Sequence, residues 1–497
     1  MADAVGRTGG HSELSKLRKE LRRLDTIFFL ISAMVAVDTV GAIAIGGAQA
    51  FTWLLVLFAT FFVPSALASA ELGAAIPEEG GAYVWVRSAF GRFTGALTSL
   101  LYWAGTPLWL GGSLTVVAIA VYEGFGSPLS TATALVFGTI FIVGATIGAI
   151  VPLRYGKWLP SSGAIGQIVL LTFFTISAVV FGIQHGFHGI AVGDFSPSYG
   201  VFIAIVPILL YSFVGIELPS SAAEEMVDPR RDIPVAIARA GIGQLLMYGV
   251  PILAVLLVLP PERLSSLNGL IDAMKAVFTV YGGSVDPSGA VTLTGLGAVF
   301  GAIGGALFIW VLFASGTAWI MGAGRAQAAA CLDGAGPAVF GRISQRTGVP
   351  VVMGLISGGV ALATMATYLL ATEGDGQKYF SVGLTVAVVM IVLAYLLIFP
   401  AFVALRIRQP DLPRPFRVPG GLRTAWAISI VSTAWAVLAA ICLLWPGFGT
   451  AHPDAALPAG FEGQRARFEL LVLCPVAAMV PICIGLYWFG RVPRRAD

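Results

Sequence analysis

Charged residues are scarce in this chain of 497 residues, in which aspartate, glutamate, lysine and arginine together make up 11%. Soluble domains carry about 25% charged residues, so this scarcity excludes a soluble globular protein and an enzyme held by a single membrane anchor. The formal net charge of +3 indicates no strongly basic surface, and no nucleic-acid partner is expected.

Cysteine and histidine are equally rare, with four residues of each. The cysteines fall in apolar stretches or at their ends, so no structural disulfide is expected. The histidines form no cluster with metal-ligand spacing, and no metal site is expected. No phosphate-binding loop, GxSxG or HExxH pattern occurs, so the sequence predicts neither an enzyme nor a bound cofactor. These residues are Cys331, Cys442, Cys474, Cys483, His11, His185, His188 and His452.

Apolar residues dominate the chain, at 57% of the sequence with a mean hydropathy of +0.88. Glycine contributes 61 residues, which suits helices that pack closely in a bilayer. Given about 20 residues for each crossing, the sequence predicts an all-α membrane protein that spans the lipid bilayer about 12 times. The apolar stretches lie near 27–48, 52–75, 95–122, 130–150, 160–184, 200–222, 236–260, 294–321, 350–371, 379–405, 423–446 and 469–490.

Positive charge is concentrated in every second segment between these stretches, which all lie on the same side of the membrane. Of the 29 lysines and arginines, 24 fall on the side of the N-terminus and five on the other side. By the positive-inside rule, both termini are expected in the cytoplasm and the spans in the plasma membrane. A polar stretch of about 25 residues precedes the first apolar run, so no cleavable signal peptide is expected.

The segments outside the spans suggest a division of the chain. A basic N-terminal arm (1–25) precedes a transport core (26–405), a cytoplasmic loop (406–422), two further helices (423–490) and a short tail (491–497). Four prolines within Gln409–Gly421 exclude a helix from that loop. In the outer segment 261–293, a short helix is expected at Leu264–Phe278.

The N-terminal arm carries leucines at helical spacing among its basic residues. This pattern suits a helix that lies on the inner leaflet, and a solvated basic arm is the alternative. The leucines are Leu14, Leu17, Leu21 and Leu24.

Two apolar stretches contain signs of interruption. The sixth carries Gly215, Glu217 and Pro219, and the first carries Asp38 and Gly41. A break and an acid inside a membrane span are tolerated mainly where they line a protein cavity. Interrupted spans five helices apart are the sequence cue for inverted repeats, so spans 1–5 and 6–10 are expected to form two repeats around a binding site.

Three acids in these spans have both functional and structural interpretations. Glu217 is a candidate coupling group, because an ionised carboxylate at that depth requires water or a cation; a protonated acid bonded between helices is the alternative. Asp38 is expected to attract an amino group or a proton, or else to cap the kink. Glu71 is expected either to pair with an arginine such as Arg87 at an inner gate or to contact interfacial water.

Aromatic residues in three spans could line a substrate path and stack on a cation. The alternative is ordinary packing, which is common for aromatic side chains in membranes. The residues are Tyr102, Trp103, Tyr211 and Trp319.

Four segments, taken in order, resemble the amino acid–polyamine–organocation transporters over residues 25–420. They are AELGAAIPEEGGAYVWV, FVGIELPSSAAEEMVDPRRDIPVAI, LDGAGPAVFGRISQRTGVP and DLPRPFRVPGG. Within that family the chain is most similar to bacterial amino acid antiporters of the arginine/agmatine and glutamate/γ-aminobutyrate type. The resemblance implies a five-plus-five inverted-repeat fold in which helices 1 and 6 are discontinuous and hold the substrate.

The resemblance also implies roles for individual residues. The substrate carboxylate would meet backbone N–H groups at Gly41, Ala42 and Ile43, and its amino group would meet carbonyls near Tyr211–Gly215. Thr106 would line the pocket. Tyr102, Tyr211 and Trp319 would act as gates, and Glu217 would couple or gate transport. The complete candidate set is Asp38, Gly41, Ala42, Ile43, Tyr102, Thr106, Tyr211, Gly215, Glu217 and Trp319.

Several positions depart from the family pattern. Gly41-Ala42-Ile43 replaces a glycine-x-glycine break, and Leu110 replaces an asparagine of the arginine exchanger, which argues against a simple transfer of arginine specificity. Lys157 stands at the cytoplasmic start of span 5, where it does not suit coupling by a lysine within that span. Leu332 replaces an arginine that is common before Asp-Gly.

The sequence therefore predicts a secondary transporter for amino acids that works by alternating access. A polyamine or other organic cation is the alternative substrate, and a channel or a transporter-like sensor is the alternative class. A homodimer is left open.

Overall fold

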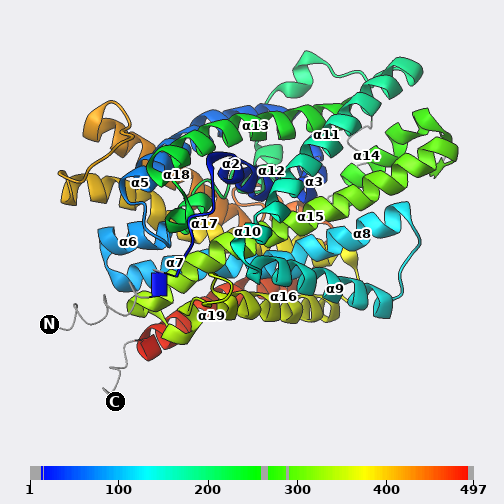
Figure 1. The fold of residues 1–497 in the computed structure, drawn as a ribbon. Helices are drawn as coiled ribbons and strands as arrows, with labels where there is room; N and C mark the ends of the chain where they lie inside the picture. The colour runs from blue at the N-terminus through cyan, green and yellow to red at the C-terminus, as the bar shows by residue number, and fades with distance from the viewer. Residues whose placement is uncertain (1–12, 15, 259–266, 287–289, 491–497) are drawn as a thin grey trace.

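The computed structural model describes residues 13–14, 16–258, 267–286 and 290–490. Long helices fill almost all of this part of the chain (Figure 1), and one short antiparallel hairpin pairs β1 (Gly283–Val285) with β2 (Val291–Leu293). The helices are α2 (Arg23–Met34), α3 (Val40–Ala44), α4 (Ala48–Leu57), α5 (Val63–Ala75), α6 (Ala82–Phe90), α7 (Arg92–Trp109), α8 (Thr115–Phe125), α9 (Thr131–Ile150), α10 (Leu153–Gly156), α11 (Trp158–His185), α12 (Tyr199–Tyr211), α13 (Pro229–Val258), α14 (Gly269–Phe278), α15 (Gly295–Ala330), α16 (Val351–Ala371), α17 (Gly376–Arg408), α18 (Gly421–Leu444) and α19 (Arg465–Gly490).

The membrane spans expected from hydropathy are present. Within the described residues, eleven helical stretches are long and apolar enough to cross a bilayer, and α12 is a twelfth, shorter apolar helix. Each of the twelve predicted stretches corresponds to one of them. The predicted helix at Leu264–Phe278 corresponds to α14, which begins at Gly269; residues 264–266 lie outside the described residues.

The sixth predicted span is interrupted where the sequence indicated. Helix α12 ends at Tyr211, and a 3₁₀ helix begins only at Leu218 and runs to Glu225. Gly215, in between, has a φ of +100°, a backbone conformation that residues with a side chain rarely adopt. We call Ser212–Glu217 the second break.

The first predicted span is also interrupted, but earlier than expected. Val35 and Ala36 leave the helical conformation, with ψ angles of 86° each, before a 3₁₀ turn at Val37–Thr39 and helix α3. We call Val35–Ala36 the first break. Gly41, Ala42 and Ile43, which stand where the family has its glycine-x-glycine break, are not unwound, since all three lie inside α3. A Cβ at Gly41 would lie 3.1 Å from the Gly269 nitrogen, so Gly41 permits a close approach of α14.

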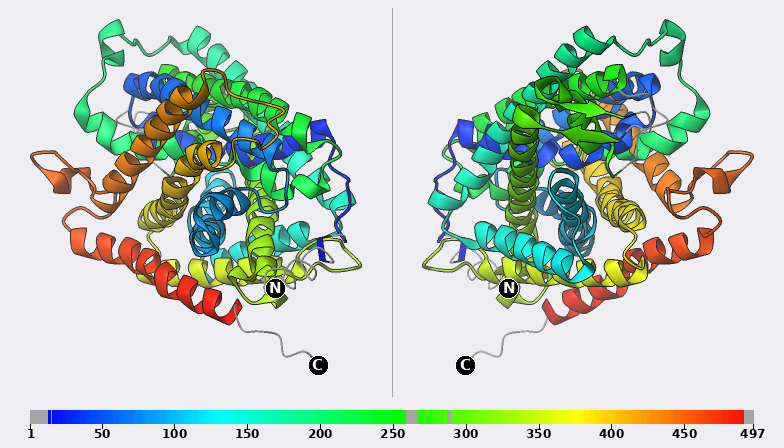
Figure 2. Two further views of the ribbon diagram at one scale, coloured as in Figure 1. Left: turned by 90° about the vertical axis from the view of Figure 1, so that its left-hand side faces the viewer. Right: turned by 90° about the vertical axis from the view of Figure 1, so that its right-hand side faces the viewer.

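The described ends of the chain meet at one end of the helix bundle. The Ile343 N–H donates to the carboxylate of Glu13 at 3.0 Å, and Gly490 at the end of α19 packs against Gly334 and Gly336. We call this end, which carries the α15–α16 connection, the terminal face. Figure 2 shows α19 (red) along the edge of the bundle, where its side chains are largely exposed.

The leucines of the N-terminal arm do not form one helix. Residues 17–20 are in no helix or strand, and Leu21 pairs with Met226 in a parallel bridge. The N–H groups of Glu20 and Leu21 both donate to the Glu225 carbonyl at 3.0 Å. Leu21 is therefore buried while Leu24 is exposed, because the backbone pairs with the connection after the second break.

Candidate functional site

The two breaks lie side by side in the interior. A Cβ built on Gly215 would lie 3.1 Å from the Trp319 ring and 3.5 Å from the Met34 side chain. The positive φ of Gly215 and this crowding both require glycine there. Two interrupted helices that meet in a membrane interior are the arrangement in which transporters bind substrates.

A break leaves backbone carbonyls without helical partners, and in a membrane these need other donors. Helices on two sides of the first break supply them. The Gln167 amide on α11 donates to the Val35 carbonyl at 2.9 Å and lies 3.4 Å from the Ser32 carbonyl. The Trp319 indole on α15 donates to the Ala33 carbonyl at 2.8 Å.

Helix α13 supplies the remaining donors and joins the two breaks. The Gln244 amide nitrogen donates to the Met34 carbonyl at 3.2 Å and also to the Ser212 carbonyl of the second break. One turn later, the Tyr248 hydroxyl accepts the Ala36 N–H at 2.8 Å and donates to the Ala36 carbonyl at 3.1 Å. Gln244 thus sets the position of one break relative to the other.

Glu217 lies at the second break and is buried, with 2% of its surface exposed. The Tyr395 hydroxyl on α17 lies 3.0 and 3.2 Å from the two carboxylate oxygens and donates its proton to them. The same hydroxyl accepts the Gly215 N–H at 3.2 Å. Tyr102 lies beside this carboxylate, so two tyrosines from different helices face Glu217.

Asp38 lies in the 3₁₀ turn just after the first break, and 4% of its surface is exposed. The Trp109 indole donates to one carboxylate oxygen, Oδ2, at 3.1 Å. The other oxygen, Oδ1, has no hydrogen-bond partner among the described residues. A buried carboxylate oxygen without a partner is costly, so this oxygen is available to a donor that a substrate would bring.

An aromatic cluster separates the two acids. The Trp319 ring makes an edge contact with Trp109 at 6.4 Å between ring centroids and a tilted contact with Tyr102 at 6.0 Å. Tyr211 is buried close to Asp38 at the end of α12. The structure therefore brings together all three predicted gate residues and both predicted acids.

Other candidates have different surroundings. Thr106 on α7 is buried, and its hydroxyl has no partner among the described residues. The Trp103 indole donates to Ser357 at 2.8 Å, which ties α7 to α16 and supports the packing interpretation for this residue. Lys157, at the start of α11, pairs with Asp25 at 2.9 Å.

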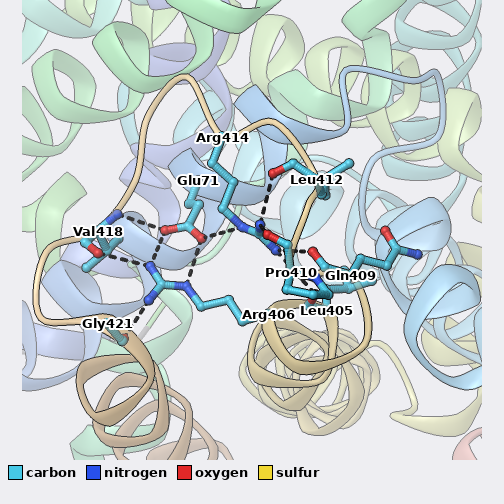
Figure 3. A network of polar contacts seen from close by, with 9 residues as sticks. All are labelled: Glu71, Leu405, Arg406, Gln409, Pro410, Leu412, Arg414, Val418 and Gly421. Atoms are coloured by element: carbon cyan, nitrogen blue, oxygen red, sulfur yellow. Dashed lines mark hydrogen bonds and ion pairs between the residues drawn. The ribbon is translucent and has the colours of Figure 1, made fainter.

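Glu71 pairs with arginines, as one of the two sequence interpretations predicted, but not with Arg87. Figure 3 shows its buried carboxylate bound by Arg406 and Arg414, while the Val418 N–H donates to it at 2.8 Å. Arg87, the expected partner, pairs instead with Asp333 at 2.8 Å. Contact with interfacial water is also wrong, because the folded-back loop after α17 covers Glu71.

A second buried ion pair lies between the two breaks and the terminal face. The Arg325 guanidinium on α15 binds the Glu225 carboxylate with distances of 2.7 and 3.2 Å. Glu79, between α5 and α6, lies next to this pair and is also buried. The buried arginine side chains, Arg325 here and Arg406 and Arg414 in the Glu71 cluster, all pair with carboxylates other than Asp38 and Glu217. Within the part of the chain that the structure describes, no lysine or arginine forms an ion pair with Asp38 or Glu217.

Sequence reasoning missed the side chains that hold the breaks. Tyr395, Gln167, Gln244 and Tyr248 are single polar groups inside long apolar runs and follow no motif. A polar residue deep in a predicted span was the one available signal, since such groups must find partners in lipid.

Comparison with known proteins agrees with this architecture. The sequence profile of the amino acid permease family matches residues 21–456. A probable agmatine/putrescine antiporter of Lactococcus lactis is 25% identical over 410 residues, covering 81% of this chain and 83% of the relative. An uncharacterized transporter of Legionella pneumophila is 28% identical over 445 residues, covering 80% and 85%. Another, of Mycobacterium bovis, is 27% identical over 356 residues, covering 71% and 74%.

Proposed function

Because this chain belongs to the amino acid permease family and is a multi-pass secondary transporter, we propose that it exchanges small organic cations that carry amino groups. The substrates are basic amino acids and their decarboxylated amines. The substrate binds between the two breaks and crosses the plasma membrane by alternating access. The observation that carries this proposal is the pair of buried acids, Asp38 and Glu217, with which no lysine or arginine among the described residues forms an ion pair.

Charge and shape at the site support a cationic substrate. The unpartnered oxygen of Asp38 accepts an ammonium or guanidinium proton, and the rings of Trp109 and Trp319 offer faces for cation–π contact. The Lactococcus relative, a probable agmatine/putrescine antiporter, is consistent with this chemistry. Glu217 is the coupling group, and Tyr102, Tyr211 and Trp319 are the gates.

A neutral amino acid is the second candidate. The first N–H groups of a helical segment have no helical acceptor and attract anions, and such groups begin at Val37, after the first break. They replace Gly41–Ile43 as the proposed site for a substrate carboxylate. Asp38 in the same turn would repel that carboxylate, which favours an amine over a zwitterion.

The direction of the chain in the membrane follows from its charges. The positive-inside distribution supports a cytoplasmic terminal face, and in this orientation the Arg325–Glu225 and Lys157–Asp25 pairs close the cytoplasmic side. The division into an arm (1–25), a transport core (26–405), a loop (406–422), two peripheral helices (423–490) and a tail (491–497) is part of this proposal.

Counterflow in proteoliposomes tests the proposal. Vesicles preloaded with labelled arginine, agmatine, putrescine or leucine are diluted into buffer with or without external substrate, at several pH gradients. External cationic amines should accelerate efflux of the labelled cations, and D38N and E217Q should abolish that acceleration. D194N, an exposed acid, is the matched control. Exchange of leucine without exchange of the cations selects the second candidate, and efflux that external substrate never accelerates indicates a channel.

A further inference from the structure

A large apolar groove lies outside the transport site, between α17 and α18. Its volume is about 730 Å³, in the range of pockets that enclose a small molecule. Its lining residues recur three and four positions apart on both helices, so each helix contributes one continuous face. On α18 this face runs from Trp426 to Ile441, which at 1.5 Å per residue spans about 22 Å.

Small and large apolar residues both line the groove. Ala404 on α17 and Ala434 on α18 contribute small side chains, and the larger Ile430 and Trp426 are about half exposed. The Thr433 hydroxyl lines the groove without a hydrogen-bond partner among the described residues. An apolar chain is therefore the occupant that this surface fits.

Positive charge gathers at the end of the groove on the terminal face. Arg408, the last residue of α17, lines the groove there; its guanidinium donates to the Ala89 carbonyl and lies 5.9 Å from the Phe90 ring centroid. Arg417 and Arg423 are exposed in the following segment and make no ion pair within the described residues.

The Glu71 cluster fixes the loop that carries these arginines. Arg406 and Arg414 share the one carboxylate of Glu71, so one positive charge stays uncompensated even inside the cluster (Figure 3). The segment from Arg406 to Arg423 holds five arginines and one acid, Asp411. A basic cluster at the cytoplasmic end of a groove between spans is the surface that anionic lipid headgroups bind.

We propose that this groove is a binding site for an anionic phospholipid of the inner leaflet. An acyl chain lies along the α17–α18 groove, and the phosphate is held by Arg408 and Arg423. A second copy of the chain is the less favourable occupant, because both copies would set their arginine clusters at the same depth, where like charges repel.

The site bears on the transport machinery through α17. Tyr395, which holds Glu217 and Gly215, lies five residues before Pro400, which lines the groove. Proline removes a backbone hydrogen bond and weakens a helix at that point, so a chain packed beside Pro400 supports the segment that carries Tyr395. The lipid-binding site itself does not depend on which substrate is carried; only this effect on exchange rests on the proposed function.

Thermal unfolding of the purified full-length protein tests the site without any transport measurement. The midpoint is measured after adding phosphatidylglycerol or phosphatidylcholine to the delipidated protein. Phosphatidylglycerol should raise the midpoint more than phosphatidylcholine does, and A434W, which fills the groove, should lose most of that difference. V431W, an exposed lipid-facing position of the same helix that does not line the groove, should keep it.

The same midpoint measurement on R408Q and R423Q tests whether these two arginines hold the phosphate, and R154Q, at an exposed arginine, is the control. R423Q leaves the packing intact and keeps the test decisive if A434W does not fold. Equal midpoint shifts with phosphatidylglycerol and phosphatidylcholine would overturn the proposal. It would also be overturned if V431W or R154Q lost the difference between the two lipids to the same extent as the groove and headgroup variants. Self-cross-linking of I430C in membranes would also overturn it, because that result places a second copy over the groove.

Discussion

The hydroxyl of Tyr395 lies 3.0 Å from the carboxylate of Glu217, although 178 residues separate them in the chain. This one hydroxyl contacts both the acid and the backbone N–H of Gly215, so α17 holds the second break at its most strained residue. Removing it leaves a buried N–H and a buried carboxylate each with one partner fewer, at a cost of about 1–3 kcal/mol for each group.

We therefore expect Y395F to slow exchange about tenfold or more, since 1.4 kcal/mol corresponds to a factor of ten. Counterflow in proteoliposomes measures the rate, and size-exclusion profiles check that the protein is folded. Y122F, at an exposed tyrosine, should exchange at the normal rate. Normal exchange by Y395F would remove this tyrosine from the transport cycle.

The second prediction concerns Gln244, because its amide nitrogen donates hydrogen bonds to carbonyls at both breaks. Q244L leaves the buried Ser212 carbonyl unpaired, at a cost of about 1–3 kcal/mol, and removes one of the two donors to the Met34 carbonyl, which keeps the Ala36 N–H. We expect a marked fall in the unfolding midpoint together with a higher KM, because the relative position of the breaks sets the binding site.

The control for this change is Q184L, which removes an exposed amide from α11. It should leave both the midpoint and KM as they are. If Q244L lowered the midpoint yet bound and exchanged substrate with unchanged KM, Gln244 would stabilise the fold without positioning the site.

The sequence predicts the spans and the second break well, because the signals for them are local. Apolar runs of membrane length mark the helices, and Gly215 with Pro219 marks an interruption whatever lies around it. The first break carries no such signal, since Val35 and Ala36 are ordinary apolar residues. Their non-helical backbone is held by Gln167, Gln244 and Tyr248 from distant helices.

The same reasoning explains the error at Glu71. An acid near the end of a span can pair with any arginine that the fold brings to it, and Arg87 was simply the nearest in sequence. Its actual partners lie more than 330 residues away, at the end of α17 and in the loop that follows. Pairings over that distance depend on how the helices assemble, which local patterns do not encode.

Breaking the Glu71 cluster is the third prediction. E71Q leaves Arg406 and Arg414 buried without a compensating charge, and removal of one partner from a buried pair costs about 3–5 kcal/mol. We expect a large fall in the unfolding midpoint in detergent. E78Q, which disrupts the exposed pair with Arg87, should shift stability by no more than about 1 kcal/mol. Equal effects of the two changes would show that the cluster contributes no more than a surface pair.

Glu79 supplies a prediction of pH dependence. It lies between α5 and α6, where burial and the neighbouring Glu225 carboxylate raise its pKa well above the usual value. Arg325 partly opposes this rise, and Glu224 adds to it through charge while its N–H donates to Glu79 at 3.2 Å. A carboxyl group whose pKa is raised on folding stabilises the fold while it is protonated, and this contribution is lost as the pH rises through the raised pKa.

We therefore expect E79Q, which fixes a neutral side chain, to raise the unfolding midpoint at pH 8 relative to the unmodified protein. The advantage should shrink steadily as the pH falls toward 4.5, the ordinary pKa of the acid, where half of it is protonated in the unfolded chain as well. E123Q, at an exposed acid, should show no such trend. A midpoint difference between E79Q and the unmodified protein that stayed constant from pH 8 to pH 4.5 would mean that Glu79 titrates alike in the folded and the unfolded chain, so that folding does not raise its pKa and the amide acts through its hydrogen bonds.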